Sequence, residues 1–207
     1  MPTSILGYSI VTYLLQIKDR HNGNILLDRD GHLIHIDFGF ILSNTPGNIG
    51  FEAAPFKLPP EYVEVLGGVN GAAFSEFKAL FRHGFEAARK HCDRIISTSI
   101  IICQLANIQT ESLLKFLKKH LSNLCKRASS SFIHSFIILF WPTSLMFADS
   151  TLPCFMVYGE QSANQLRDRF QPTLTHAFIG DHINKLIDSS LGSHWTRLYD
   201  SVRSTSS

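Results

Sequence analysis

The sequence lacks the features that mark several common classes of protein. Its formal charge of +2 is small, and no basic helix with interleaved aromatic residues is present, so we expect no nucleic-acid partner. Nothing at the N-terminus combines a positive charge with a long apolar stretch, so a secretory signal is not expected. A length of 207 residues with 44% hydrophobic content suits one domain, or one and a fraction, with a real core.

The cysteines offer no sign of a metal site or a disulfide framework. The four cysteines are Cys92, Cys103, Cys125 and Cys154. They form no Cys-x-x-Cys pair and no spacing typical of metal ligands. We therefore expect reduced thiols that pack inside a cytosolic protein.

Two short motifs carry the chemistry that the sequence does contain. The first is Lys18-Asp19-Arg20-His21-Asn22-Gly23-Asn24, and the second is His35-Ile36-Asp37-Phe38-Gly39. Phosphoryl transfer needs one group that orients the attacking hydroxyl and two oxygen ligands that hold Mg²⁺ against the phosphates. Asp19, Asn24 and Asp37 can supply these three parts. The offset from Asp19 to Asn24 equals that of the protein-kinase catalytic loop.

A β-hairpin is predicted between the two motifs. Apolar runs at 25–27 and 33–36 flank a turn at 28–31, in which Gly31 suits a positive φ. Such a hairpin would bring the chain back on itself, so that Asn24 and Asp37 lie beside each other on one metal ion.

The order of the residues in the first motif differs from that of the protein kinases, which have His-Arg-Asp where this chain has Asp-Arg-His. In this it resembles the phosphatidylinositol 3-/4-kinase family, whose catalytic loop is Asp-Arg-His-x-x-Asn. The wider run is similar to the beta type of phosphatidylinositol 4-kinase within that family: Gly7-Tyr8-Ser9, Phe56-Lys57-Leu58 and Arg89-Lys90-His91. The resemblance covers residues 5–96 and, more weakly, 149–202.

The resemblance implies a role for each residue of the motifs. Asp19 and His21 would serve the attacking inositol hydroxyl, with His21 assisting its deprotonation or stabilising the transferring phosphate. Arg20 belongs to the same catalytic motif, and we expect it to order the loop rather than react. Asn24 and Asp37 would hold Mg²⁺ or Mn²⁺, and through the metal the phosphates of the co-substrate ATP.

The segment from Phe38 to about Pro60 corresponds, by the resemblance, to the activation loop that forms the floor for a lipid headgroup. Lys57 is its only Lys or Arg. A multiply phosphorylated inositide calls for several cations, whereas a single lysine suits plain phosphatidylinositol. We therefore predict that Lys57 meets the headgroup; the alternative is a solvated loop lysine. Transfer to the 4-position rests on the resemblance alone.

Helices are predicted on both sides of this loop. Residues 8–17 are apolar on most faces and would form a buried helix by the resemblance, although their β-branched side chains also suit a strand. Residues 61–66 indicate a short helix closed by Gly67 and Gly68. An apolar stripe then predicts one amphipathic helix that runs to about residue 96 and packs in the core. Its members are Phe74, Phe77, Phe81, Phe85 and Ala88.

Residues 97–148 break this pattern and match nothing on either side. They contain a basic stretch, a serine run at 129–131 and an apolar patch at 132–147. Three interpretations stay open: an insertion that acts at a membrane surface, a transmembrane helix, and a mis-joined gene model or translated non-coding sequence. The transmembrane helix is disfavoured, because the apolar core before Pro142 is far shorter than the ~20 residues needed to span a bilayer. The gene-model interpretation is favoured.

The chain becomes typical of the family again at residue 149, with helices predicted at 164–170, 175–191 and 194–202. The expected fold class is α+β: a mostly helical C-lobe of a protein-kinase-like fold with a small β-hairpin at the active site. Its parts would be a core at 1–96, the atypical insertion at 97–148 and C-terminal helices at 149–207. An N-lobe is expected to be absent, because only 18 residues precede Asp19 and no Gly-x-Gly-x-x-Gly loop occurs.

The leading hypothesis is a phosphatidylinositol 4-kinase that transfers the γ-phosphate of ATP to the inositol ring of phosphatidylinositol. The resemblance implies phosphatidylinositol in a membrane surface as a partner, with small-GTPase or adaptor regulators. It also implies a cytoplasmic protein at the surface of Golgi-type endomembranes. The alternative is a truncated, non-catalytic lobe that binds membranes or partners. A protein kinase is disfavoured by the Asp-Arg-His order and by the lack of an Ala-Pro-Glu segment.

Overall fold

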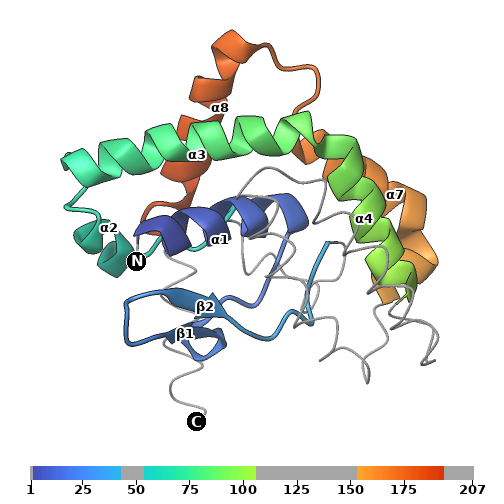
Figure 1. Cartoon of the computed structure of the whole chain (residues 1–207), viewed down its shortest axis with the longest axis horizontal. Coiled ribbons are helices and arrows are strands. Elements are labelled where there is room, and N and C mark those ends of the chain that lie inside the picture. Colours follow the sequence, from blue (N-terminus) through green and yellow to red (C-terminus); the bar gives the residue numbers. More distant parts are fainter. Residues whose placement is uncertain (1, 43–53, 106–152, 194–207) are drawn as a thin grey trace.

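The computed structural model describes residues 2–42, 54–105 and 153–193. Within these ranges the chain is mostly helical with one two-stranded antiparallel sheet, as predicted (Figure 1). The helix predicted at 194–202 and most of the segment 97–148 lie outside the described residues. No helix within the described ranges is both long and apolar enough to span a bilayer.

The central element is helix α1 (Pro2–Leu15), which contains residues 8–15 of the run 8–17 that was predicted to be a buried helix. It starts earlier and ends two residues sooner than predicted. It lies between helix α3 and the hairpin (Figure 1), and it is apolar on most faces because it is covered on most faces. The helix ends at Leu15 because Gln16 adopts a left-handed φ of 50°, and the Gln16 side-chain amide donates to the Tyr13 carbonyl at 2.9 Å. The chain then enters the Asp19 loop.

The predicted hairpin is confirmed as strands β1 (Ile25–Leu27) and β2 (Leu33–His35), which pair with Ile25 opposite His35. A short 3₁₀ helix, η1 (Asn22–Asn24), leads into it. Gly31 closes the turn with a φ of 80°, as the sequence predicted. In β2 the side chains alternate: Leu33 and His35 are buried toward α1, and Ile34 is exposed.

Helices α2 (Pro60–Val65) and α3 (Ala72–Lys90) come next in the described part of the chain. Gly67 and Gly68 end α2 with φ values of 79° and 81°, which confirms the predicted cap. The apolar stripe of α3 is also confirmed, and its buried members are Phe74, Phe77, Phe81, Phe85 and Ala88.

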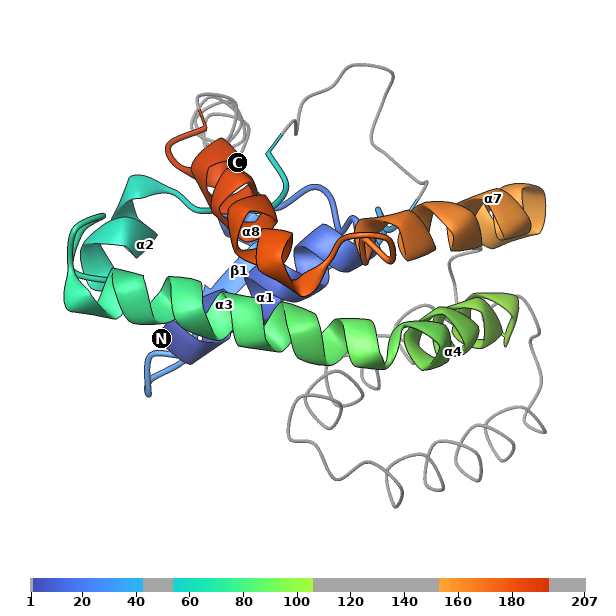
Figure 2. The ribbon, with the colours of Figure 1, turned by 90° about the horizontal axis from the view of Figure 1, so that it is seen from above.

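The prediction of one helix to residue 96 was wrong. Helix α3 ends at Lys90, and a new helix, α4 (Cys92–Leu105), starts in another direction after His91 (Figure 1). The turn brings α4 alongside α7 (Pro153–Arg169) (Figure 2). The break between α3 and α4 is therefore set by tertiary packing rather than by helix propensity. Helix α7 also begins well before the predicted residue 164. The C-terminal end of α4 and the N-terminal end of α7 lie at the same end of this pair (Figure 2).

The last described helix, α8 (His176–Ser190), matches the predicted helix at 175–191 and packs on α3. Two arginines fix the corner between α7 and α8. Arg89 of α3 donates to the carbonyls of Gln171 at 2.7 Å and Leu174 at 2.8 Å. Arg169 donates to the Leu14 carbonyl at 2.9 Å, near the end of α1, and burial lowers the pKa of Arg169 to about 10. The C-terminal helices are thereby tied to the helix that precedes the Asp19 loop.

Candidate active site

The two sequence motifs lie on neighbouring segments of the folded chain. The backbone N–H of Lys18 donates to the Phe40 carbonyl at 2.9 Å, and that of Leu42 donates to the Leu15 carbonyl at 2.8 Å. The hairpin adds a third link, from the N–H of Ile36 to the Asn24 carbonyl at 3.0 Å. The loop after α1 and the segment after β2 are therefore held side by side, as the hairpin prediction required.

Backbone strain is concentrated in these two segments. Five non-glycine residues in the described part of the chain have a positive φ, and four of them are Gln16, Asp19, Asp37 and Leu42. A non-glycine residue pays a steric cost in the left-handed region and stays there only where its surroundings enforce it. Such outliers gather at functional sites. Asp19 and Asp37 have φ values of 64° and 55°, so both are strained residues of the kind that gathers at functional sites.

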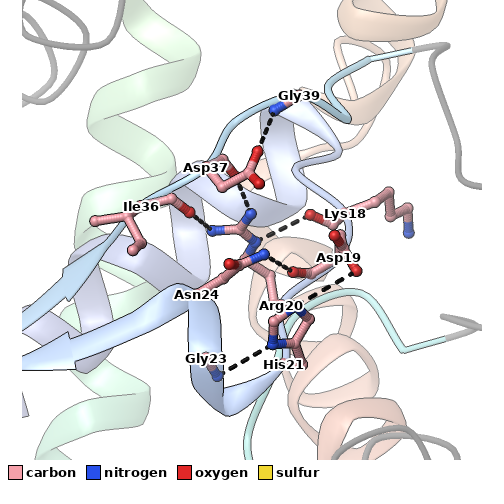
Figure 3. Close-up of polar contacts among 9 residues, drawn as sticks. All are labelled: Lys18, Asp19, Arg20, His21, Gly23, Asn24, Ile36, Asp37 and Gly39. Atoms are coloured by element: carbon pink, nitrogen blue, oxygen red, sulfur yellow. Dashed lines mark hydrogen bonds and ion pairs between the residues drawn. The ribbon is translucent and has the colours of Figure 1, made fainter. Parts of the chain in front are cut away.

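Arg20 is buried and bridges the two segments through its guanidinium group (Figure 3). Its Nε donates to the Lys18 carbonyl at 3.0 Å, one Nη donates to the Ile36 carbonyl at 2.8 Å, and the other donates to the Asp37 carbonyl. The guanidinium carbon also lies 5.4 Å from the centre of the Phe38 ring. These contacts with backbone and ring fit the predicted ordering role of Arg20.

His21 and Asp19 face each other, with Nε2 of His21 4.0 Å from Oδ1 of Asp19. On the other side of the ring, Nδ1 accepts a hydrogen bond from the backbone N–H of Gly23 at 3.1 Å (Figure 3). When one imidazole nitrogen accepts, the proton of the neutral ring sits on the other nitrogen. The structure therefore favours the form of His21 with its proton on Nε2, directed toward the Asp19 carboxylate.

Asn24 and Asp37 bring two kinds of oxygen donor to the same region. Asn24 is buried, and its side-chain nitrogen donates to the Asp19 carbonyl at 3.0 Å, which leaves its amide oxygen as the ligating atom. Asp37 is exposed, and its Oδ1 accepts from the Gly39 N–H at 3.1 Å. One amide oxygen and one carboxylate form a donor set that suits a hard divalent cation such as Mg²⁺. These residues fit the predicted metal.

Lys57 lies close to this cluster although it is 35 residues away from Asn22. It is buried, and its Nζ donates to Oδ1 of Asn22 at 2.8 Å. The structure thus places Lys57 beside the loop that carries Asp19 and His21. Its predicted contact with a lipid headgroup stays a prediction.

The sequence analysis missed a pair of stacked rings under the site. Tyr8 of α1 stacks on His35 of β2, with ring centres 3.9 Å apart and planes 13° apart. Nδ1 of His35 is buried and has no hydrogen-bond partner among the described residues. Burial first, and then the positive charges of Arg20 and Lys57, lower the pKa of His35 to about 3. The alternation of Leu33 and His35 in β2 was the available signal that this ring faces inward.

A second cluster of possible ligands, at the hairpin turn, has a structural explanation. It consists of Asp28, Asp30 and His32. Oδ1 of Asp28 accepts from the N–H groups of Asp30 at 2.9 Å and His32 at 2.7 Å, and Oδ2 lies 2.9 Å from Nδ1 of His32. These bonds, first among them the one from the His32 backbone, lower the pKa of Asp28. The carboxylate stabilises the turn.

Comparison with known proteins agrees with this geometry. Residues 3–101, which include both motifs, the hairpin and Lys57, match the family model described as phosphatidylinositol 3- and 4-kinase. The chain contains a domain of the phosphatidylinositol 3-/4-kinase family. The segment matched by the family model includes every residue that the sequence analysis assigned to the site.

Several phosphatidylinositol 4-kinases are similar to nearly the whole chain. Phosphatidylinositol 4-kinase PIK1 of Saccharomyces cerevisiae is 43% identical over 199 residues, which is 96% of this chain and 14% of the relative. Phosphatidylinositol 4-kinase beta of Xenopus tropicalis is 39% identical over 197 residues, 95% of this chain and 19% of the relative. The chain thus spans less than a fifth of the length of these relatives. The predicted resemblance to this kinase family, and to its beta type, is confirmed.

Proposed function

We propose that the described residues form the C-lobe of a phosphatidylinositol 4-kinase, and that they serve the transfer of the γ-phosphate of ATP to the inositol ring of phosphatidylinositol. The observation that carries this proposal is the joining of the Asp19 loop to the Asp37 segment by Arg20 and by the Ile36–Asn24 backbone bond. These links gather an acid, a histidine and two oxygen ligands of a divalent cation, which are the parts that phosphoryl transfer requires.

The geometry suggests a division of work between Asp19 and His21. Nδ1 of His21 already accepts a hydrogen bond from the Gly23 N–H, so the neutral ring is suited to donate a hydrogen bond from Nε2. Asp19 is then the group that accepts the hydrogen bond of the attacking inositol hydroxyl. The Nε2–H of His21 can stabilise charge on the transferring phosphate.

Asn24 and Asp37 would hold the metal, Mg²⁺ or Mn²⁺, through an amide oxygen and a carboxylate oxygen. The metal supplies neutralisation of the phosphate charge when it is bound. The role of the chain is to hold both oxygens in fixed positions. The left-handed φ of Asp37 and the hydrogen bond from the Gly39 N–H to its Oδ1 restrain the Asp37 carboxylate. ATP is the proposed co-substrate.

The remaining proposals concern the setting in which the reaction takes place. Phosphatidylinositol is presented in a membrane surface, so the protein would act at the cytoplasmic face of an endomembrane, and small GTPases or adaptors would recruit it there. The names of the similar proteins, phosphatidylinositol 4-kinases from yeast and frog, support the lipid substrate. The endomembrane setting and the recruiting proteins rest on the resemblance in sequence alone. The transfer to the 4-position has the same support.

The test begins with the metal. Mn²⁺ should bind to the 207-residue chain, as followed by electron paramagnetic resonance, and Asp37→Ala should weaken that binding at least about tenfold, since a carboxylate ligand is lost. Asp181→Ala is the matched control, because Asp181 is an exposed carboxylate of α8 outside both ligand clusters, and it should leave Mn²⁺ binding unchanged. Equal loss in both variants would contradict the metal site.

The second step tests the reaction. Vesicles that contain phosphatidylinositol are incubated with γ-labelled ATP, Mg²⁺ and the chain, and labelled lipid is measured. Labelling that Asp37→Ala abolishes and Asp181→Ala spares supports the proposal. Labelling that survives Asp37→Ala contradicts the assigned site. Intact Mn²⁺ binding without labelled lipid would favour the alternative of a non-catalytic lobe for this chain.

A further inference from the structure

Lys57 makes a contact that a residue waiting for a lipid headgroup does not need. Its side chain is buried, at 8% exposure, and its ammonium group donates to the side-chain oxygen of Asn22 at 2.8 Å. Asn22 opens the short helix η1 and lies between His21 and Gly23, the two residues that share the Nδ1 hydrogen bond. A charged donor makes a stronger bond than a neutral one. Lys57 therefore restrains the turn that carries His21.

The backbone on both sides of Lys57 is in turn held by the end of helix α8. The N–H of Phe56 donates to the hydroxyl of Ser190 at 3.4 Å, and Leu58 forms a parallel bridge with Leu191. Phe56, Leu58 and Ser190 are all buried. The position of the Lys57 backbone is thus set by residues more than 130 positions further along the chain.

We propose that Lys57 is a positioning residue that connects the C-terminal helix α8 to the catalytic loop. The connection runs from Ser190 and Leu191, through the backbone at Lys57, to Asn22. A displacement of the end of α8 then changes the placement of His21 without touching substrate. This inference rests on the proposed function for its catalytic meaning, and it differs from the headgroup contact that the sequence predicted for Lys57.

The two roles of Lys57 make different predictions. A lysine that only binds the headgroup affects the KM for the lipid and leaves the loop unchanged when no lipid is present. A positioning lysine changes the loop in the free protein. The decisive measurement is therefore made without metal, nucleotide or lipid.

The experiment follows hydrogen exchange of single backbone amides in the 207-residue chain by nuclear magnetic resonance. The reporters are the N–H of Gly23, bonded to His21 Nδ1, and the N–H of Asn24, bonded to the His21 carbonyl. Lys57→Met should speed their exchange at least about tenfold, because a charge-assisted bond no longer opposes local opening. The N–H of Leu42, bonded to the Leu15 carbonyl, should keep its rate.

Asn22→Ala is the second variant, and it removes the same bond from an exposed position, so it tests the proposal even if Lys57→Met fails to fold. Both changes together should speed exchange no more than either alone. Ser190→Ala should act in the same direction with a smaller effect, because it removes only one of the two links to α8. Lys78→Met, in a lysine that lies over the Phe74 ring of α3, is the control and should change nothing.

Two results would overturn the proposal. If the exchange rates of the Gly23 and Asn24 amides are unchanged in Asn22→Ala, the bond from Lys57 to Asn22 does not restrain the loop. Unchanged exchange in Ser190→Ala removes the link to α8. Neither result depends on Mn²⁺ binding or lipid labelling, so a failure of the proposed function and a failure of this inference are seen in different measurements.

Discussion

The guanidinium group of Arg20 donates a hydrogen bond to the backbone carbonyl of Asp37. The residue that follows Asp19 in the catalytic motif thus also fixes the residue predicted to hold the metal. The other two hydrogen bonds of the Arg20 guanidinium, to the carbonyls of Lys18 and Ile36, join the same two segments. One planar guanidinium group thus donates to three carbonyls on two segments. The compact ammonium group of a lysine cannot reach all three.

Arg20→Lys is therefore expected to lower the free energy of unfolding by about 2 kcal/mol or more, because an ammonium group leaves at least one buried carbonyl unpaired. Urea denaturation measures this change. Arg29→Lys, in the exposed hairpin turn, is the control and should stay within about 0.5 kcal/mol of the original chain. Equal stability of the two variants would show that the Arg20 guanidinium does not hold the site together.

Gly23→Ala should disturb His21 with little effect on stability. A Cβ atom at Gly23 would lie 2.9 Å from Cε1 and 3.0 Å from Nδ1 of the His21 ring, which is too close for a real contact. The ring must therefore turn away and lose the bond from the Gly23 N–H. We expect labelling of phosphatidylinositol to fall at least about tenfold, since a misplaced hydrogen-bond donor to the transferring phosphate commonly costs that much. The melting temperature should change by no more than about 3 °C, because the position is exposed.

The informative comparison for Gly23→Ala is with Gly39→Ala. A Cβ at Gly39 would lie 3.3 Å from Oδ1 of Asp37, a tight contact that a small shift relieves. Its effect on labelling should be the smaller of the two. If Gly23→Ala retains full activity while His21→Ala does not, the hydrogen bond from Gly23 is not what orients the ring.

The local part of the site could be predicted from the sequence, and the long-range part could not. The hairpin turn at Gly31 acts over a few residues, so the strand pairing and the backbone bond from Ile36, next to Asp37, to Asn24 are as expected. The predicted meeting of Asn24 and Asp37 on one metal ion stays a prediction. The break at His91 depends on the packing of α4 against α7, which no short pattern encodes. The contact of Lys57 with Asn22 likewise depends on where α8 holds the chain.

His35 should make the protein sensitive to acid. In the unfolded chain its ring takes up a proton near its ordinary pKa of 6.5, whereas in the folded chain it stays neutral down to a pKa of about 3. Between these values the unfolded chain binds more protons, so stability falls as the pH is lowered. From this residue alone we expect a loss of about 2 kcal/mol between pH 7.5 and pH 5, at 1.36 kcal/mol per unit.

His35→Phe isolates this contribution, because phenylalanine can keep the stack with Tyr8 and cannot titrate. Urea denaturation of both proteins at pH 7.5 and pH 5 gives the comparison, in which other titrating groups cancel. The original chain should lose about 2 kcal/mol more than the variant over this interval. An equal loss in both would mean that His35 takes up its proton in the folded state as readily as in the unfolded chain.

Arg169 and Arg167, two residues apart on α7, should differ sharply in their importance. Arg169 donates from a partly buried position to the Leu14 carbonyl at 2.9 Å, and the Tyr13 hydroxyl donates to the Arg169 carbonyl at 3.2 Å. Arg167 forms an exposed ion pair with Asp93 at 2.7 Å. Surface pairs contribute little, whereas a buried carbonyl that loses a charged donor is left unpaired.

Arg169→Met is accordingly expected to lower the free energy of unfolding by about 2 kcal/mol, and Arg167→Met is expected to lower it far less. Both can be measured by urea denaturation at neutral pH, and methionine preserves most of the apolar stem in each case. Because Arg169 holds the end of α1 just before the Asp19 loop, its loss should also speed exchange of the Lys18 N–H, which Arg167→Met should not do. Similar values for the two variants would mean that the C-terminal helices do not support the loop through Arg169.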